Sequence, residues 1–493
     1  MHGVPRARVL GAGARSATRL AVLLTASGLH ASDGSFDARA LEQVAREELS
    51  RTRTPGIAVA VVQGDRIVYA KGFGVASVET GVPVTPDTLF FSASMGKMLT
   101  AAVVVPLLAE RGISLDQPIG EYVQGFGPRL RRVTMRQLLS HSAGLVNSTP
   151  DGALDVYDEI ERGREAERLL GYADGDYFFT DPGRLFSYSN TGFAIAGFVA
   201  QELEARPFWQ LMEQRLFKPL AMTRATYRPT MAMTYPFAVG HRVDEEGRLQ
   251  VSRPAFNEVT YRPAGLAYVS ANDMSRFALA LLNEGRLEGR QLLPADLAAT
   301  LSRPTAEIPY RFDVAAELFE GARYGLGCFV KEHRGEPIFM HPGGDDVYGS
   351  ILLLAPRRKF AVVVLANQTF AILSRIVERA MELSMPLLER PAAEPERTLP
   401  IPSAESARLA GTYANGALRI ELRDAEGQLL RRDFYADEPE GPAEPVRKLG
   451  ENRFRVTFPG NPAPTEFIFI PGPDGRPEYL FGDLVAARRA AGP

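Results

Sequence analysis

The chain has 493 residues, of which 45% are hydrophobic and 23% charged, an ordinary composition for a soluble globular protein of two or three domains. Its 56 basic and 59 acidic residues give a net charge of −3, which indicates neither a nucleic-acid partner nor a basic membrane-binding surface. The single cysteine, Cys328, excludes an internal disulfide framework, and the six scattered histidines contain no His-Glu-x-x-His run. We therefore expect no metal site and no cofactor.

The first 31 residues resemble a secretory signal in composition. Four arginines precede any acidic residue, and an apolar run from Leu20 to Leu29 leads to Ala31, a small residue suited to cleavage. Such a run is too short for a helix that spans the ~30 Å core of a bilayer, so we expect no stable membrane span. Export to the periplasm or the extracellular space is the leading prediction. A mitochondrial-type presequence and an unstructured tail are the alternatives.

Strands and helices alternate between residues 32 and 388. β-Branched segments at each end of this region predict two antiparallel hairpins, and helical periodicity appears between and after them. Strands at both ends with helices between them predict an α+β fold, whose sheet is completed by the two ends of the region. The hairpin strands are Ile57–Val62 with Ile67–Ala70 and Ser350–Ala355 with Phe360–Ala366, and the helical segments are Asp273–Leu282 and Phe370–Leu383.

A change of pattern marks a second domain. Five prolines among charged residues predict a stiff linker over 389–403. Beyond it, apolar and polar residues alternate between turn signals, which predicts a small antiparallel β-barrel over 404–493. Because few contacts are expected to cross such a linker, a chain that ends near Arg390 should keep all the chemistry. We expect the barrel to form the contact of a homo-oligomer, and a lid over the cleft is the alternative.

The first chemical motif is Ser94-Met95-Gly96-Lys97, followed by an apolar run. If a helix begins near Ser94, the serine and Lys97 lie on the same face, close to free N–H groups at the helix N-terminus. A lysine acts as the base for a serine only when its amine is neutral, so its pKa must fall by ~3 units through burial or nearby positive charge. Taken alone, the motif is common by chance, and an N-cap serine with a solvated lysine is the favoured interpretation.

Two further motifs carry groups suited to acyl transfer. Tyr188 and Asn190, two residues apart, can present a phenol and an amide to one cleft. His341 precedes Gly343 and Gly344, and a glycine-rich strand edge lets backbone N–H groups approach a ligand, as an oxyanion hole requires. Each motif alone also fits an ordinary turn or loop.

The three motifs together, in this order, resemble those of class C β-lactamase-related serine hydrolases, which are penicillin-binding-protein-like. That family pairs Ser-x-x-Lys with Tyr-x-Asn and with a Lys-Thr-Gly or His-x-Gly strand. The resemblance spans about residues 40 to 385. Flanking stretches that also resemble the family are Ile113–Pro118, Leu138–Leu145, Ala264–Leu266, Ser270–Phe277 and Tyr324–Gly327.

The resemblance implies a β-lactamase/transpeptidase-like fold over 32–388, with an antiparallel sheet flanked by helices and a helical lobe. The barrel over 404–493 resembles the lipocalin-like appendage of some members. By the same resemblance, Ser94 is the acylated nucleophile, Lys97 its base and Tyr188 the proton shuttle. The implied substrate-binding residues are Asn190, His341 and Gly343, the implied oxyanion hole is formed by the N–H groups of Ser94 and Gly344, and His141 is implied to be structural.

The resemblance further implies hydrolysis of an ester or an amide through an acyl-Ser94 intermediate. The expected substrates are small esters, amides or peptides, including those that contain D-amino acids. His341 and Pro342 stand where true class C lactamases have lysine and threonine, which removes a fixed cation and weakens the case for penicillin hydrolysis. A β-lactamase or D-Ala-D-Ala carboxypeptidase is the alternative, and a catalytically idle scaffold or sensor is the second.

Overall fold

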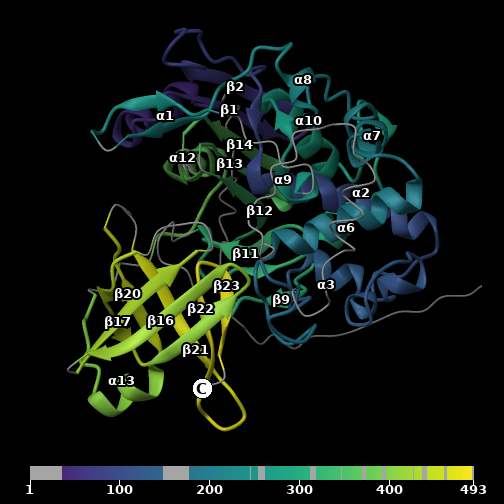
Figure 1. The fold of residues 1–493 in the computed structure, drawn as a ribbon. Coiled ribbons are helices and arrows are strands. Elements are labelled where there is room, and N and C mark those ends of the chain that lie inside the picture. The colour runs from purple at the N-terminus through teal and green to yellow at the C-terminus, as the bar shows by residue number, and fades with distance from the viewer. Residues whose placement is uncertain are drawn as a thin grey trace, which may run out of the picture. The chain divides into compact units, whose positions relative to one another are not determined.

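A computed structural model of the chain is shown in Figure 1. The signal predicted over residues 1–31 and the start of the helix predicted over Phe370–Leu383 lie outside the residues that the structure describes. The described residues are 36–147, 177–244, 246–253, 261–310, 318–345, 347–368, 374–390, 396–425, 427–435, 441–459 and 464–490.

The main sheet has eight strands in the order β2-β1-β14-β13-β12-β11-β10-β9, and every neighbouring pair is antiparallel. Both predicted hairpins are confirmed, and β1 pairs with β14, so the two ends of the predicted region do complete one sheet. The strands are β1 (Gly56–Gln63), β2 (Arg66–Gly74), β9 (Ala306–Glu307), β10 (Arg323–Tyr324), β11 (Phe329–His333), β12 (Glu336–Gly344), β13 (Gly349–Ala355) and β14 (Phe360–Ala366).

Helices cover both faces of this sheet (Figure 1). Because side chains alternate along a strand, Val59 and its second neighbours on β1 share a core with α1 (Ala38–Thr52) and α12 (Ser374–Ser384). Ala60 and its second neighbours instead join the core that contains α2 (Gly96–Glu110) and α10 (Ala271–Leu282). Burial on both faces explains why β1 has an unbroken apolar run rather than an alternating pattern.

The helical lobe is built around α2 (Gly96–Glu110), which is apolar on every side and almost wholly buried. By length and composition, the segment Ala93–Glu110 would suffice to cross a membrane, yet 83% of its most apolar window is buried inside the protein, so its apolar side chains belong to the core. The other helices on this side of the sheet are α3 (Met135–Leu139), α6 (Asn190–Glu204), α7 (Phe208–Met212), α8 (Pro229–Ala232), α9 (Arg262–Gly265), α10 (Ala271–Leu282) and α11 (Leu297–Leu301).

Among the residues that the structure describes before the linker, three two-stranded sheets complete the fold. They pair β3 (Phe90–Phe91) with β6 (Tyr268–Val269), β4 (His241–Val243) with β5 (Leu249–Val251), and β7 (Arg286–Leu287) with β8 (Arg290–Gln291). The first of these matters for the chemistry, because β3 leads directly into the turn that carries Ser94.

The C-terminal part is a second antiparallel sheet, preceded by α13 (Ser403–Leu409). Its edge strands β18 and β19 are separated only by Val446, so the nine described strands form a near-closed barrel, as the alternation predicts. Ile420 and Leu422 are buried whereas Arg419 and Arg423 are exposed. The strands are β15 (Gly411–Asn415), β16 (Leu418–Ala425), β17 (Gln428–Phe434), β18 (Glu444–Pro445), β19 (Arg447–Gly450), β20 (Arg453–Val456), β21 (Thr465–Pro471), β22 (Pro477–Gly482) and β23 (Val485–Arg489).

Candidate active site

Ser94 lies in a tight turn rather than in the first turn of an α-helix. A 3₁₀ turn over Ala93–Met95 connects β3 to α2, and Ala93 has a left-handed φ of 44°. A residue other than glycine in this conformation costs about 1–3 kcal/mol and persists only where the surroundings impose it. Ser94 itself is partly exposed, although both its neighbours are buried. The turn therefore holds the serine at the surface of a rigid core.

Glycines let three backbone segments meet at this turn. A Cβ on Gly343 of β12 would lie 2.3 Å from the carbonyl oxygen of Ser92, and one on Gly265 of α9 would lie 2.2 Å from that of Ala93. Only glycine permits such an approach. The glycine edge of β12 consequently lies directly against the Ser94 turn, with Gly344 as the last residue of the strand. This placement suits the predicted oxyanion hole, which stays a prediction.

Lys97 is fully buried, and its amine contacts three oxygen atoms. Nζ lies 3.0 Å from Ser94 Oγ, 2.8 Å from Asn190 Oδ1 and 2.6 Å from the carbonyl oxygen of Ala264. Burial lowers its pKa well below the ordinary lysine value. A neutral amine has two N–H bonds, and two of its partners, the amide oxygen and the carbonyl, can only accept. The lone pair is thus left for the proton of Ser94, as a general base requires.

Tyr188 and Asn190 reach the same site from the segment that enters α6. Ser189 caps this helix by accepting the N–H of Gly192, which fixes the turn between the phenol and the amide. Burial raises the pKa of Tyr188, although a hydrogen bond with Ser94 lowers it in part. Tyr188 is therefore a protonated phenol at neutral pH, which can donate a proton, whereas a neutral Lys97 can accept one.

Next to Tyr188, a chain of hydrogen bonds joins His141, Tyr324 and His341. Ser189 N–H donates to Nδ1 of His141 (3.0 Å), and because burial lowers the pKa of this ring well below its ordinary value, the neutral ring carries its proton on Nε2. Nε2–H then donates to the Tyr324 oxygen (3.2 Å), and the Tyr324 hydroxyl donates to Nε2 of His341 (2.8 Å). Finally, Nδ1–H of His341 donates to the carbonyl of Pro342 (2.5 Å). At one end the Ser189 N–H can only donate, and at the other the Pro342 carbonyl can only accept. These two backbone groups therefore fix the direction of every hydrogen bond in the chain.

This chain argues against the predicted role of His341 as a donor to substrate. Both ring nitrogens are occupied within the protein, the side chain is 1% exposed, and burial lowers its pKa to about 3. The geometry gives His341 a structural role, together with His141, whose ring centroid lies 4.1 Å from that of Tyr188. Tyr324 was visible in the sequence only as part of a family-like stretch. Nothing in the sequence marks the carbonyl of Ala264 as a partner of Lys97.

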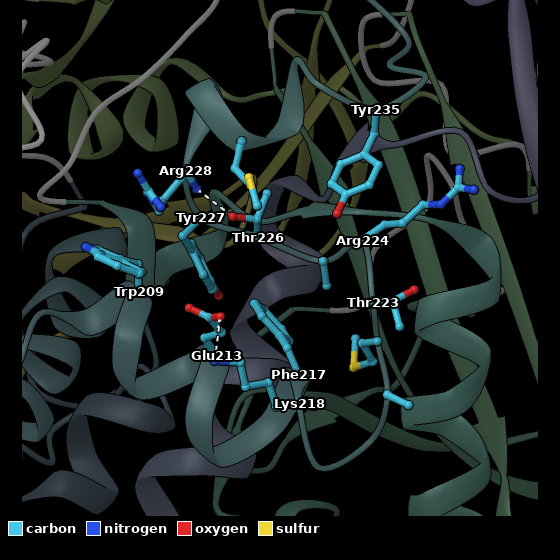
Figure 2. A pocket seen from close by; sticks show the side chains of 14 residues that line it. Trp209, Glu213, Phe217, Lys218, Thr223, Arg224, Thr226, Tyr227, Arg228 and Tyr235 are labelled. Atoms are coloured by element: carbon cyan, nitrogen blue, oxygen red, sulfur yellow. Dashed lines mark hydrogen bonds and ion pairs between the residues drawn. The ribbon is translucent and has the colours of Figure 1, made fainter.

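Cys328 and a cavity in the helical lobe contribute no group to this site. Cys328 is buried, and its thiol donates to the carbonyl of Leu301, so it is a packed residue of the core. No cluster of metal-ligating side chains occurs among the residues that the structure describes. A cavity of about 330 Å³ in the helical lobe is shown in Figure 2; aromatic side chains, including Trp209 and Tyr227, line it, and no catalytic residue does.

We expect the pH dependence of acylation to follow Lys97. As pH rises through its lowered pKa, the neutral amine accumulates and the rate should rise to a plateau below pH 10. The raised pKa of Tyr188 should keep the plateau level up to pH 10, and the lowered pKa values of His141 and His341 predict no step near 6.5. The rate of labelling by a fluorescent phosphonate between pH 5 and 10 measures this. An ascending limb centred near 10.5 would contradict the assignment.

Comparison with known proteins gives consistent matches. A family model described as beta-lactamase matches residues 41–381. "Protein flp" of Staphylococcus aureus (strain MW2) is 24% identical over 345 residues, which is 69% of this chain but 64% of that protein, so the chain spans less than two thirds of this relative's length. "Penicillin-binding protein 4" of Amycolatopsis lactamdurans is 28% identical over 376 residues, 73% of this chain and 93% of that protein.

Solved structures resemble the chain to different extents. A crystal structure of SurE with D-Leu matches 92% of this chain and 99% of its own, with a TM-score of 0.70 and 26% identity. A class C beta lactamase from Rhodobacter sphaeroides matches 70% of this chain and 98% of its own, with a TM-score of 0.54 and 22% identity. The first likeness therefore extends beyond the hydrolase part, whereas the second shows the fold alone.

Proposed function

Because this chain belongs to the beta-lactamase family of serine hydrolases, which includes penicillin-binding proteins, we propose that it hydrolyses an ester or an amide through an acyl-Ser94 intermediate. The leading activity is that of an esterase or a peptidase on small or D-amino-acid-containing substrates. One observation carries the proposal: both N–H bonds of a neutral Lys97 point to acceptors, so its lone pair is available to Ser94.

In the proposed acylation, Oγ of Ser94 attacks the carbonyl carbon while its proton passes to Nζ of Lys97. The carbonyl oxygen becomes an oxyanion, which the N–H groups of Ser94 and Gly344 stabilise. The bond to the leaving group then breaks, and the leaving group takes the phenolic proton of Tyr188, which regains one from the Lys97 ammonium. Water repeats these steps in deacylation and restores Ser94. No proton is gained or lost over the two halves.

The site has a neutral side chain at the position of His341, which bears on the class of substrate. Where a lysine would bind a substrate carboxylate, this chain has a buried, neutral His341 whose N–H is already donated to Pro342. A hydrogen bond to a charged group contributes about 1.5–3 kcal/mol. Binding of a penicillin carboxylate therefore lacks this contribution here, whereas a neutral ester has no carboxylate that needs it. The likeness to SurE with D-Leu over 92% of the chain supports a D-amino acid in the substrate.

We expect kcat/KM for p-nitrophenyl butyrate to exceed that for benzylpenicillin by about 10- to 100-fold, as the missing charged contact implies. D-Leucine p-nitroanilide should be cleaved faster than its L-enantiomer, which serves as the matched control. Initial rates of all four compounds, corrected with Ser94→Ala, give the ranking. Faster hydrolysis of benzylpenicillin would favour the β-lactamase or D-Ala-D-Ala carboxypeptidase alternative. Failure to acylate Ser94 with any of them would favour an idle scaffold or sensor.

We also propose that the protein is exported, to the periplasm or the extracellular space, on the basis of the arginines and the apolar run before Ala31. The masses of the secreted and the whole-cell protein would test this, since cleavage near Ala31 removes the first 31 residues. A homo-oligomer formed through the C-terminal barrel is the corresponding proposal for assembly.

A further inference from the structure

The C-terminal barrel contacts the segment that carries Tyr188. The N–H of Tyr188 donates to the carbonyl of Leu484 (2.8 Å), and the N–H of Ala486 donates to the hydroxyl of Ser187 (3.1 Å). Asp483 and Leu484 form the turn between β22 and β23, and both have left-handed φ values (47° and 68°). A turn in this costly conformation is held against Tyr188 itself, through its backbone N–H.

A second contact links the barrel to Lys97 through three asparagines. Asn415, at the end of β15, accepts the N–H of Asn147 on its Oδ1 (3.1 Å). Asn147 in turn accepts the N–H of Asn190 on its own Oδ1 (3.1 Å), and Asn190 Oδ1 accepts from Nζ of Lys97 (2.8 Å). Three hydrogen bonds, through Asn147 and Asn190, therefore connect Asn415 of the barrel with Nζ of Lys97.

The side-chain amide of Asn415 forms hydrogen bonds both within the barrel and with the hydrolase part. Its Nδ2 donates to the carbonyl of Ala486 in β23 (2.6 Å), while its Oδ1 accepts from the hydrolase part, and the side chain is 2% exposed. An aspartate would lack the donor, and an alanine would leave the partly buried N–H of Asn147 and the carbonyl of Ala486 without these partners. Each unpaired buried group costs about 1–3 kcal/mol. The position therefore requires one donor and one acceptor in the geometry of an amide.

We propose that Asn415 is a positioning residue for Lys97 and Asn190, and hence that the barrel is a structural component of the active site. This inference rests on the proposed acyl-Ser94 chemistry. It replaces the expectation that few contacts cross the linker and that a chain ending near Arg390 keeps all the chemistry. The described residues from Phe36 onward also fall in one compact unit, which includes the barrel.

The test compares two asparagine variants in the full chain. Asn415→Ala should lower kcat by about 10- to 100-fold, since a displacement near 1 Å at the reacting groups has an effect of this order. It should also admit water to Lys97 and move the ascending limb of the pH profile of kcat/KM to higher pH. Asn452→Ala is the matched control, because Asn452 bridges two groups of the barrel (Nδ2 to the Phe469 carbonyl, 2.7 Å; Phe469 N–H to Oδ1, 3.1 Å). The control should keep both kcat and the limb.

The outcomes separate this inference from the proposed function. If wild type is acylated at Ser94 and Asn415→Ala matches it within twofold in kcat, with an unmoved limb, the inference is overturned and the function stands. If wild type is never acylated, the function itself fails. Should Asn415→Ala not fold, Asn147→Ala tests the same path from the hydrolase side, and an unchanged kcat there overturns the proposal. Where all variants fold, the loss in the Asn147/Asn415 double variant should be smaller than the product of the single losses.

Discussion

Ser94→Ala is expected to abolish acyl-enzyme formation and to lower kcat by about 10,000-fold or more, as removal of a nucleophile does in other serine hydrolases. The fold should persist, because Ser94 is partly exposed and its hydroxyl contributes no apolar contact to the core. Intact-mass spectrometry after a slow ester should show one acyl group on wild type, and tandem spectra of the peptide that contains Ser94 should place it on this residue.

A control serine makes this experiment specific. Ser302 terminates α11, and its hydroxyl donates to the carbonyl of Ala298 at 2.8 Å, away from the catalytic groups. Ser302→Ala should therefore acylate as wild type does. An acyl group on any serine other than Ser94, or acylation that survives in Ser94→Ala, would remove the nucleophile assignment.

Lys97→Ala and Tyr188→Phe should each lower kcat by about 1,000-fold or more, with losses that do not multiply in the double variant. The reason is that both residues belong to one proposed proton relay: Nζ lies 3.0 Å from Ser94 Oγ, and the phenol shares a hydrogen bond with that hydroxyl. Residues that act as one unit show this non-additivity. Single-turnover rates of the two single variants and the double variant measure it, and a double loss equal to the product would exclude a shared proton path.

Two further substitutions serve as controls for Lys97→Ala and Tyr188→Phe. Lys97→Arg keeps a long cationic side chain but cannot lose its proton, so it should be as inactive as Lys97→Ala at every pH below 10. Tyr227→Phe is the control for Tyr188→Phe, since Tyr227 is equally a buried tyrosine but lines the cavity of the helical lobe. It should retain the wild-type kcat. Substantial activity in Lys97→Arg would mean that another group is the base.

The parts of the molecule that could be predicted from sequence are those decided by local spacing. Ser94 and Lys97 lie three residues apart, and a single turn of helix brings Oγ and Nζ to 3.0 Å. The hairpins at β1–β2 and β13–β14 follow from β-branched runs around short turns, and the barrel from alternation between turn signals. The prediction that a helix begins near Ser94 was less accurate. Ser94 occupies a 3₁₀ turn, because close backbone contacts with Gly265 and Gly343 tighten the chain there.

Other features depend on which distant segments meet. His341 shares a pattern with substrate-binding residues, yet its ring donates and accepts within the protein, since the fold places Tyr324 and Pro342 against its two nitrogens. Asn415 lies 268 residues from Asn147, and no local pattern distinguishes it from any other strand-end asparagine. The amino-acid sequence by itself predicted the reacting groups and the class of reaction, because three short motifs in this order resemble those of a known family. Only the tertiary structure decided their protonation and their support, because burial and hydrogen-bond partners are properties of the packed chain.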